Sequence, residues 1–271
     1  TRPIFQEFAR THPVGYSLVW ELEQESLVGF LKQVLTDDLA EMRSGTGPRW
    51  QPILFEAAME GTLTVPLAGG AEFFPLRGRL DRVDWCSTTQ AYRIVDYKYK
   101  AGSQPGTLDR NLELAAVRAL RLQPPFYLKM AQATMPGLLP QIGGLDVRAA
   151  DTPRCENVWF YYLAPNWEHK NGQGVTRVPF PGDAWESSLR GPLSQAVSLV
   201  LGGIRAGRFF IYPADYCDRC DYRVICHKTH QPTGWRARAD HAMVQPHRTL
   251  RRAKVANLSE TGEKSAKGAR S

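Results

Sequence analysis

The first long pattern in the chain is a run of apolar side chains spaced three and four residues apart, between residues 19 and 42. The run consists of Leu27, Phe30, Leu31, Val34, Leu35 and Leu39. This spacing matches the 3.6-residue period of an α-helix. We therefore predict an amphipathic helix whose apolar face packs into the core.

Three stretches after this helix have the composition of strands: residues 53–67, 72–85 and 91–99. Each is rich in apolar and β-branched residues and is bounded by turn-forming ones. The first is a strand or a hairpin. The last two are separated only by the turn-like residues 86–90, which predicts an antiparallel hairpin.

The second half of the chain alternates between the two kinds of element. Residues 107–135 have a helical pattern that is interrupted at Pro124 and Pro125, which can begin a helix but do not fit inside one. An aromatic-rich strand is predicted at 156–163 and a last helix at 184–206, with a loop rich in Pro, Gly and Asn between them.

Composition indicates an ordinary globular protein, and its charge is unevenly distributed. The 271 residues are 43% hydrophobic and 23% charged, enough for one large domain or two small ones. The net charge of +7 comes from the residues after Cys226, which include ten Lys and Arg but only three Asp and Glu. We expect residues 231–271 to form a basic, disordered tail, which either contacts nucleic acid or is simply solvated.

No apolar run approaches the roughly 18 residues of a membrane span, and no leader pattern opens the chain. We therefore expect a cytoplasmic protein with no membrane partner. Because the sequence begins at Thr1 in the middle of a polar stretch, we also expect an N-terminal part of the domain to be missing.

Chemistry is concentrated in the predicted hairpin. Alternate residues of a strand share a face, so Asp96 and Lys98 point the same way, and the partner strand can deliver Asp81 beside them. Paired carboxylates bind Mg²⁺, and a lysine nearby can stabilise the charge of a phosphoryl transition state. Charges alternate on many exposed strands, so this pattern alone is a weak signal.

The sequences "GRLDRVD" and "IVDYKYK" resemble the PD-(D/E)XK nuclease superfamily, in particular RecB-like exonucleases and AddB-type helicase-nuclease subunits. The resemblance implies an α/β (α+β) fold with a restriction-endonuclease-like core, in which a central mixed sheet with an antiparallel catalytic hairpin is flanked by helices. It implies that Asp81 and Asp96 are metal ligands and Lys98 the catalytic lysine.

Two further segments are similar to the same family. "LQPPFYLKMA" resembles its glutamine-tyrosine motif, so Gln123 and Tyr127 are candidate active-site residues, and Glu56 is a weaker candidate metal ligand. The resemblance implies a deoxyribonuclease that requires Mg²⁺ or Mn²⁺. It also implies an exonuclease rather than an endonuclease, acting on DNA in repair or recombination with a helicase domain or subunit.

Cys217, Cys220 and Cys226 form a C-x2-C-x5-C pattern near the end of the chain. Thiolates at this spacing suit zinc or an iron–sulfur cluster, and a disulfide is disfavoured in an intracellular chain. The segment 212–230 resembles the end of the iron–sulfur members of the family, which implies a 4Fe-4S cluster whose fourth cysteine lies upstream of Thr1. Zinc stays a rival, with His227 as its fourth ligand.

The other two cysteines, Cys86 and Cys155, are expected to be ordinary thiols. Residues 1–230 are then predicted to form the nuclease domain. Two other kinds of protein fit parts of the pattern. One is a non-catalytic DNA-binding module with a nuclease-like fold and a structural metal cluster, and the other is a zinc-ribbon interaction protein.

Overall fold

The computed structural model describes residues 2–43, 47–99, 106–148, 152–163, 175–208, 217, 220, 222, 225–226 and 231–254. Within these ranges, no helix combines the length and the apolar character needed to cross a membrane. The elements in chain order are α1 (Arg2–Thr11), α2 (Ser17–Arg43), β1 (Gln51–Leu67), β2 (Gly70–Cys86), β3 (Ala91–Tyr99), α3 (Leu112–Val117), α4 (Gln123–Leu138), the 3-10 helix η1 (Leu139–Gln141), β4 (Arg154–Leu163), β5 (Val175–Pro181), α5 (Arg190–Arg205), α6 (Gln231–Ala239) and α7 (His241–Arg251).

The chain divides into two compact units, and the nuclease domain expected for residues 1–230 stays a prediction. Unit 1 consists of Thr1–Gly61, Leu76–Asn111 and Tyr127–Asp183. Unit 2 consists of Thr62–Pro75, Leu112–Phe126 and Ala184–Ser271.

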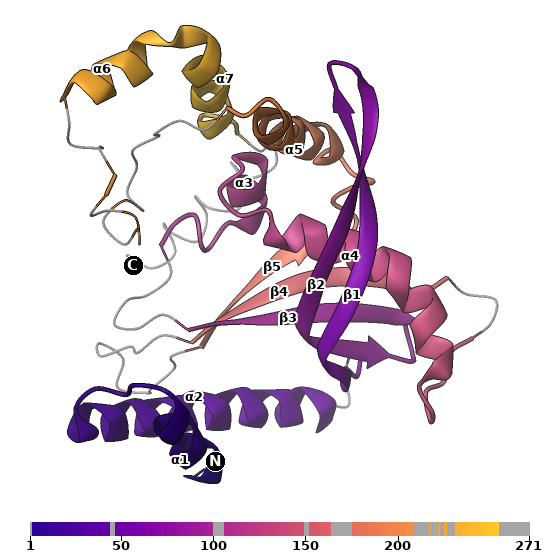
Figure 1. Ribbon diagram of the computed structural model, residues 1–271. Coiled ribbons are helices and arrows are strands. Elements are labelled where there is room, and N and C mark those ends of the chain that lie inside the picture. The colour runs from indigo at the N-terminus through magenta and orange to yellow at the C-terminus, as the bar shows by residue number, and fades with distance from the viewer. Residues whose placement is uncertain are drawn as a thin grey trace, which may run out of the picture. The chain divides into compact units, whose positions relative to one another are not determined.

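The strands form one mixed five-stranded sheet in the order β1-β2-β3-β4-β5 (Figure 1). β2 and β3 are antiparallel, β3 and β4 are parallel, and β4 and β5 are antiparallel. The predicted hairpin is confirmed, with Arg82 paired to Val95 and Cys86 to Ala91. A mixed sheet with flanking helices agrees with the predicted restriction-endonuclease-like α/β fold.

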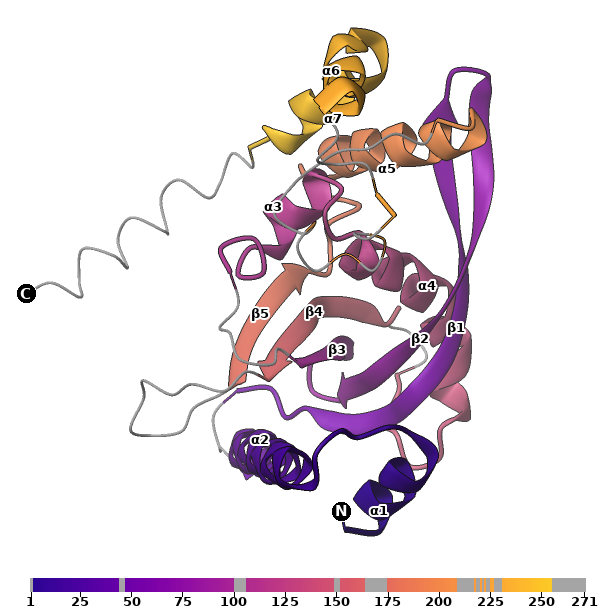
Figure 2. The same ribbon diagram turned by 60° about the vertical axis from the view of Figure 1, so that its left-hand side comes forward.

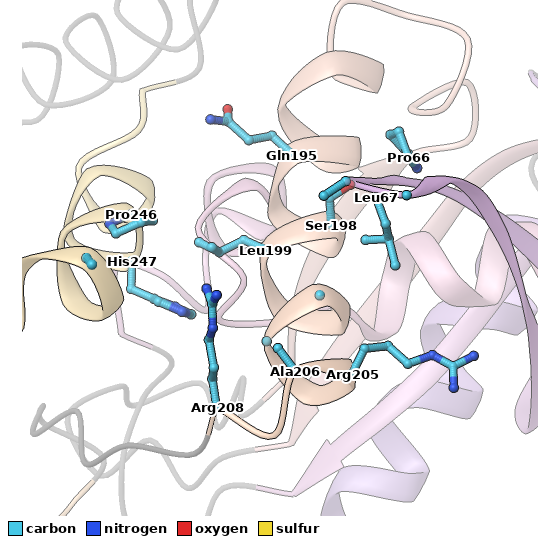
Figure 3. Close-up of a pocket in the computed structure, with 15 residues that line it drawn as sticks. Pro66, Leu67, Gln195, Ser198, Leu199, Arg205, Ala206, Arg208, Pro246 and His247 are labelled. Carbon is cyan, nitrogen blue, oxygen red and sulfur yellow. The ribbon is translucent and has the colours of Figure 1, made fainter.

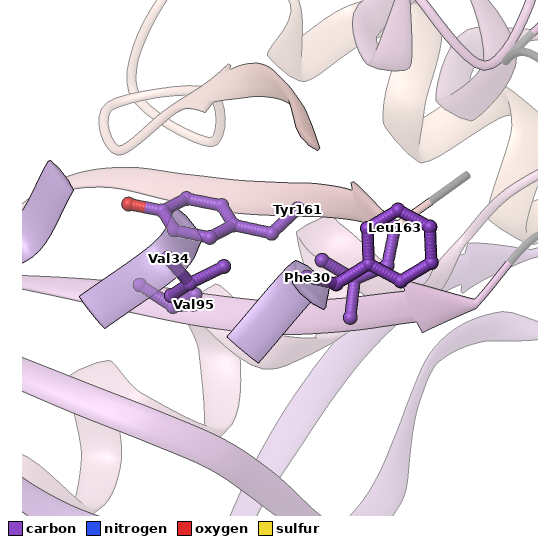
Figure 4. Close-up of a cluster of buried hydrophobic side chains, with 5 residues drawn as sticks. All are labelled: Phe30, Val34, Val95, Tyr161 and Leu163. Carbon is purple, nitrogen blue, oxygen red and sulfur yellow. The ribbon is translucent and has the colours of Figure 1, made fainter. Parts of the chain in front are cut away.

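In unit 1, helices cover both faces of the sheet (Figures 1 and 2). α2 lies against one face, where Phe30 and Val34 pack onto Val95, Tyr161 and Leu163 (Figure 4). α4 lies against the opposite face. Odd-numbered residues of β3 therefore face α2 and even-numbered ones face α4, because successive side chains of a strand point to opposite faces.

The predicted helix at residues 19–42 is present as α2, but the predicted buried face is only partly right. Leu31, Leu35 and Leu39 are 43%, 60% and 47% exposed, whereas Asp38 is buried with Phe30 and Val34. The physical reason is that the sheet face below α2 holds a buried arginine, so that a carboxylate takes the place of an apolar side chain (see below). The face of α2 that lies against the sheet therefore contains both apolar and charged side chains.

α4 approaches β1 closely at Gly61 in unit 1. A Cβ at this position would lie 2.9 Å from the carbonyl oxygen of Lys129 and from the Cα of Met130. The hydroxyl of Thr134 donates a hydrogen bond to the carbonyl of Glu60 at 2.9 Å in the same region. Glycine is thus required at Gly61 because backbone atoms fill the space of a side chain.

Two parts of the chain differ from the sequence prediction. β5 lies in the segment expected to be a loop, and it is an edge strand that contains Pro179 and Pro181. Proline lowers the strand signal because it cannot donate to the ladder, yet it is tolerated at an edge. In the segment expected to be a disordered tail, residues 231–251 form α6 and α7, where Val244 and Leu250 are buried. Residues 255–271 lie outside the described residues.

Unit 2 is built mainly from helices. α5 has a buried face of Leu193, Ala196 and Val197 and packs against α3 and α7. The indole N–H of Trp185 donates a hydrogen bond of 2.8 Å to the carbonyl of Pro125. As predicted from the two prolines, a helix begins just before them, at Gln123. The helix predicted at residues 184–206 is present as α5, which is shorter than the predicted range.

Candidate active site

The two hairpin carboxylates lie side by side in unit 1. Continuing the register of Arg82 and Val95 by one residue brings Asp81 level with Asp96. Residues directly opposite each other in an antiparallel pair share a face of the sheet. The backbone N–H of Tyr97 donates a hydrogen bond of 2.9 Å to Oδ2 of Asp81, which fixes that carboxylate against β3.

Asp96 is the most enclosed member of the site. It is 1% exposed, its Oδ2 lies 2.7 Å from Nζ of Lys98, and its Oδ1 accepts a hydrogen bond of 3.0 Å from the hydroxyl of Tyr127. Burial raises the pKa of Asp96 above its ordinary value, and the negative charge of Asp81 adds to this rise. Lys98 and Tyr127 act in the opposite direction by stabilising the carboxylate.

Lys98 pairs with a buried carboxylate, but its own side chain is partly accessible to solvent. Its side chain is 25% exposed, and its ammonium lies 4.9 Å from the centroid of the Phe160 ring. Phe160 stands opposite Asp96 in the parallel register of β3 and β4. The aromatic ring lowers the local dielectric on one side of the ammonium, which strengthens its interaction with an anion that arrives from the other side.

The structure thus brings together four of the predicted site residues: Asp81, Asp96, Lys98 and Tyr127. The carboxylate of Glu56 belongs to an exposed part of β1, where it lies 3.7 Å from the guanidinium of Arg79. Gln123 is partly buried as the first residue of α4, but it belongs to unit 2. The roles of Glu56 and Gln123 therefore stay predictions.

On the opposite face of the hairpin is a buried ionic network that sequence reasoning missed. Arg82 donates to Asp84 and to Asp38 of α2, and Arg93 donates to Asp84 at 2.8 Å and to Glu41 at 2.8 and 3.0 Å. Arg82, Asp84 and Arg93 are 3%, 0% and 5% exposed. The available signal was that "GRLDRVD" and "AYRIVDYKY" place charges at positions two apart in strands that are otherwise apolar on both faces.

Tyr97 links this network to the candidate site. Its hydroxyl accepts a hydrogen bond of 3.1 Å from Arg82, while its backbone N–H holds Asp81. Burial raises the pKa of the Tyr97 hydroxyl, although the charge of Arg82 partly offsets this rise. The ion pair between α2 and β2 therefore supports, through Tyr97, the position of a site carboxylate on the other face of the sheet.

The donor chemistry of the site fits a magnesium ion. Two adjacent carboxylates, one of them with a raised pKa caused partly by the other, form a pair whose repulsion a divalent cation would relieve. Within the described ranges, no three His, Cys, Asp or Glu side chains converge as a metal-ligand group. Mg²⁺ is nevertheless commonly held by one or two carboxylates together with waters and substrate phosphates. Asp81 and Asp96 would hold it here.

The three late cysteines are partly buried, and none of them forms a disulfide with another cysteine that the structure describes. The backbone N–H of Cys220 donates to the carbonyl of Cys217 at 3.3 Å, which places these two residues in one tight turn. Because the described residues include no three-ligand group, a cluster at these cysteines stays a prediction. His227 lies outside the described residues. Cys86 is fully buried beside Trp50, in agreement with an ordinary core thiol.

A family model described as the PD-(D/E)XK nuclease superfamily matches residues 5–227, which include both strands of the hairpin, α4 and the three late cysteines. No curated protein matches the chain.

Proposed function

The chain belongs to the PD-(D/E)XK nuclease superfamily, and we propose that Asp81, Asp96 and Lys98 carry out metal-dependent hydrolysis of DNA phosphodiester bonds. The observation that carries the proposal is the buried pair of Asp96 and Lys98, at 2.7 Å, level with Asp81 across the hairpin. Two carboxylates and one ammonium on the same sheet face supply the charges that phosphodiester hydrolysis needs.

Each side chain has a distinct role in this proposal. Asp81 and Asp96 hold the cation, which supplies positive charge to the scissile phosphate and lowers the pKa of the attacking water. Lys98 donates from its ammonium to a phosphate oxygen as negative charge develops there. Tyr127 donates a hydrogen bond of 3.0 Å to Oδ1 of Asp96 and, together with Lys98, opposes the rise in the pKa of Asp96 that burial causes.

The resemblance to RecB-like and AddB-type proteins supports a finer proposal. We place the chain among exonucleases of DNA repair or recombination that act with a helicase domain or subunit, with Mg²⁺ or Mn²⁺ as the metal. What supports this is the shared order of motifs along the sequence: the hairpin, then Gln123 and Tyr127, then the cysteines.

The decisive experiment replaces Asp81 with asparagine, which keeps the shape of the side chain but removes its charge. We expect wild-type protein to degrade linear DNA with Mg²⁺ and not with EDTA. The Asp81→Asn variant should lose at least about a hundredfold in rate, because one of the two charges that hold the metal is gone. A gel assay with end-labelled DNA measures this.

The matched control is Asp37→Asn, a change of the same chemistry on α2. Asp37 is partly exposed and lies 3.4 Å from Arg177, on the face of the sheet away from the site. This variant should cleave at the wild-type rate. DNA that is bound but never cut by the wild type, with or without Mg²⁺, would instead indicate the non-catalytic binding module.

Tyr127→Phe tests the hydrogen bond to Asp96. The Tyr127 hydroxyl lowers the pKa of Asp96, so its removal should raise that pKa further. Since the deprotonated carboxylate is the active form, the acid limb of the pH–rate profile should move to higher pH, with little change in the rate at pH 8. A rate that falls equally at every pH would contradict this account.

The cysteines lead to a further proposal, that Cys217, Cys220 and Cys226 bind a 4Fe-4S cluster with one upstream cysteine. Protein that includes the upstream sequence and is purified without oxygen should contain about four iron atoms per chain, by elemental analysis, and absorb visible light. One zinc atom per chain and no iron would instead indicate a zinc site.

A further inference from the structure

The net positive charge of the chain belongs to unit 2, although the candidate active site belongs to unit 1. Unit 2 contains 17 Lys and Arg against 9 Asp and Glu, whereas unit 1 contains 17 against 18. A polyanionic substrate gains most of its binding free energy from Lys and Arg contacts to phosphates. Unit 1 therefore offers the chemistry of hydrolysis, and unit 2 offers most of the charge for binding.

Unit 2 also contains a pocket of about 650 Å³ (Figure 3). This open pocket is lined by the tip of the β1–β2 hairpin, by α5 and by α7. The apolar part of its wall includes Leu67, Leu199 and Pro246. This volume suits a group of the size of one nucleotide, and it is too small to receive a DNA duplex.

Two polar side chains reach toward each other across the pocket in Figure 3, Arg208 and His247. The guanidinium of Arg208 has no ion-pair partner among the residues that the structure describes. Burial and the charge of Arg251 lower the pKa of His247, which favours its uncharged imidazole. The lining of the pocket thus includes one cation, Arg208, and one aromatic ring, His247.

The other cation of the pocket, Arg205, is already engaged. Its guanidinium lies 3.1 Å from the carboxylate of Glu72 and 5.3 Å from the centroid of the Phe74 ring. These contacts attach the last turn of α5 to the hairpin and offset the charge of Arg205. Arg208 is therefore the cation best placed to bind an incoming anion.

Two adjacent glycines in α5, Gly202 and Gly203, form part of the pocket wall. Glycine in a helix costs up to about 1 kcal/mol relative to alanine. Packing does not demand it here, because a Cβ at Gly202 would make only an ordinary contact of 3.5 Å with Leu67, and one at Gly203 would come no closer than 4.0 Å to Arg208. The missing side chains keep the pocket open.

We propose that this pocket binds one nucleotide of single-stranded DNA, with its phosphate on Arg208 and its base between the His247 ring and the apolar wall. Bases stack on aromatic side chains regardless of sequence, and arginine binds phosphate through two parallel hydrogen bonds. The inference rests on the proposed function for its ligand class, but it assigns binding to unit 2, apart from the site of hydrolysis.

The test measures binding of a fluorescein-labelled, 12-nucleotide single strand by anisotropy, in EDTA so that no cleavage occurs. Arg208→Gln should weaken binding about tenfold and lower the slope of log K against log salt by about 0.7, the value for one phosphate contact to a single strand. Gly202→Leu should also weaken binding, although it leaves the charge unchanged and does not lower the melting temperature.

The matched control is Arg190→Gln, which removes the same charge from the exposed first residue of α5, the helix that precedes Arg208, and this residue does not line the pocket. Its affinity should stay within twofold of wild type. Equal losses of affinity in Arg208→Gln and Arg190→Gln would overturn the proposal, because they would show that binding depends on the overall positive charge and not on the pocket. It would also fail if a 12-base-pair duplex bound as tightly and with the same sensitivity to Arg208.

The two proposals fail separately. If the wild type cleaves DNA with Mg²⁺ but does not bind the single strand in EDTA, the pocket assignment is wrong and the hydrolytic function stands. If it binds the strand through Arg208 but never cleaves, hydrolysis is wrong and the pocket stands.

Discussion

Replacing Arg82 with methionine is expected to lower the free energy of unfolding by about 3–5 kcal/mol, the range for a buried ion pair that loses one partner. Arg82 is 3% exposed, and its guanidinium is the donor to both Asp84 and Asp38. Methionine fills much of the same volume. However, it removes the positive charge that offsets the negative charges of these two carboxylates, in a region with little water. Arg93 still pairs with Asp84, but Asp38 keeps only the distant Arg177, at 3.6 Å.

Urea unfolding followed by circular dichroism measures this change. The matched control is Arg79→Met, which removes the same group three residues earlier on the same strand. The side chains of Arg79 and Glu56 are both 67% exposed, and their charges are 3.7 Å apart, so this pair should contribute at most about 1 kcal/mol. Equal effects in the two variants would show that the buried network does not stabilise the hairpin.

The same substitution should also disturb the candidate site, on the other face of the sheet. Arg82 holds the hydroxyl of Tyr97, and the backbone N–H of Tyr97 holds Asp81. The network is therefore both a connection between α2 and the sheet and a support for one site carboxylate. This dual role explains why charged residues alternate so regularly in the hairpin sequence: one set serves the site and the other set serves the support.

Sequence reasoning found the site because a strand has an unambiguous period. Once residues 72–85 and 91–99 are strands joined by a short turn, the side chains of Asp81, Asp96 and Lys98 must emerge on one face. No distant contact is needed for that conclusion. The hairpin was therefore predictable from local pattern, whereas the roles of these three residues came from the resemblance to a family and stay predictions.

The same reasoning failed where partners come from far along the chain. Apolar periodicity predicted that Leu31, Leu35 and Leu39 would be buried, yet all three are exposed, while Asp38 is buried against Arg82. The sequence of a helix predicts that the helix is amphipathic. It does not predict that the sheet against which the helix packs contains a buried guanidinium. The partners are 44 residues apart, and no local period connects them.

Lys98→Met is expected to reduce kcat for DNA cleavage by about 10²–10³-fold, the usual loss when one preorganised donor to a developing charge is removed. The KM for DNA should change little, because one ammonium is a small part of the charge that binds the substrate. The physical reason is the setting of Lys98: its Nζ lies 2.7 Å from Asp96 and 4.9 Å from the Phe160 ring, in a partly dry site where a charge acts strongly.

Removal of Lys98 also deprives Asp96 of its cationic neighbour, so the pKa of this carboxylate should rise further, because Lys98 is the main influence that lowers it. The acid limb of the residual activity should therefore move to higher pH than in wild type. Steady-state kinetics from pH 5 to pH 9 test both effects, with Lys32→Met, an exposed lysine on α2, as the control. If the loss in Lys98→Met were confined to KM, the lysine would be a binding residue and not a catalytic one.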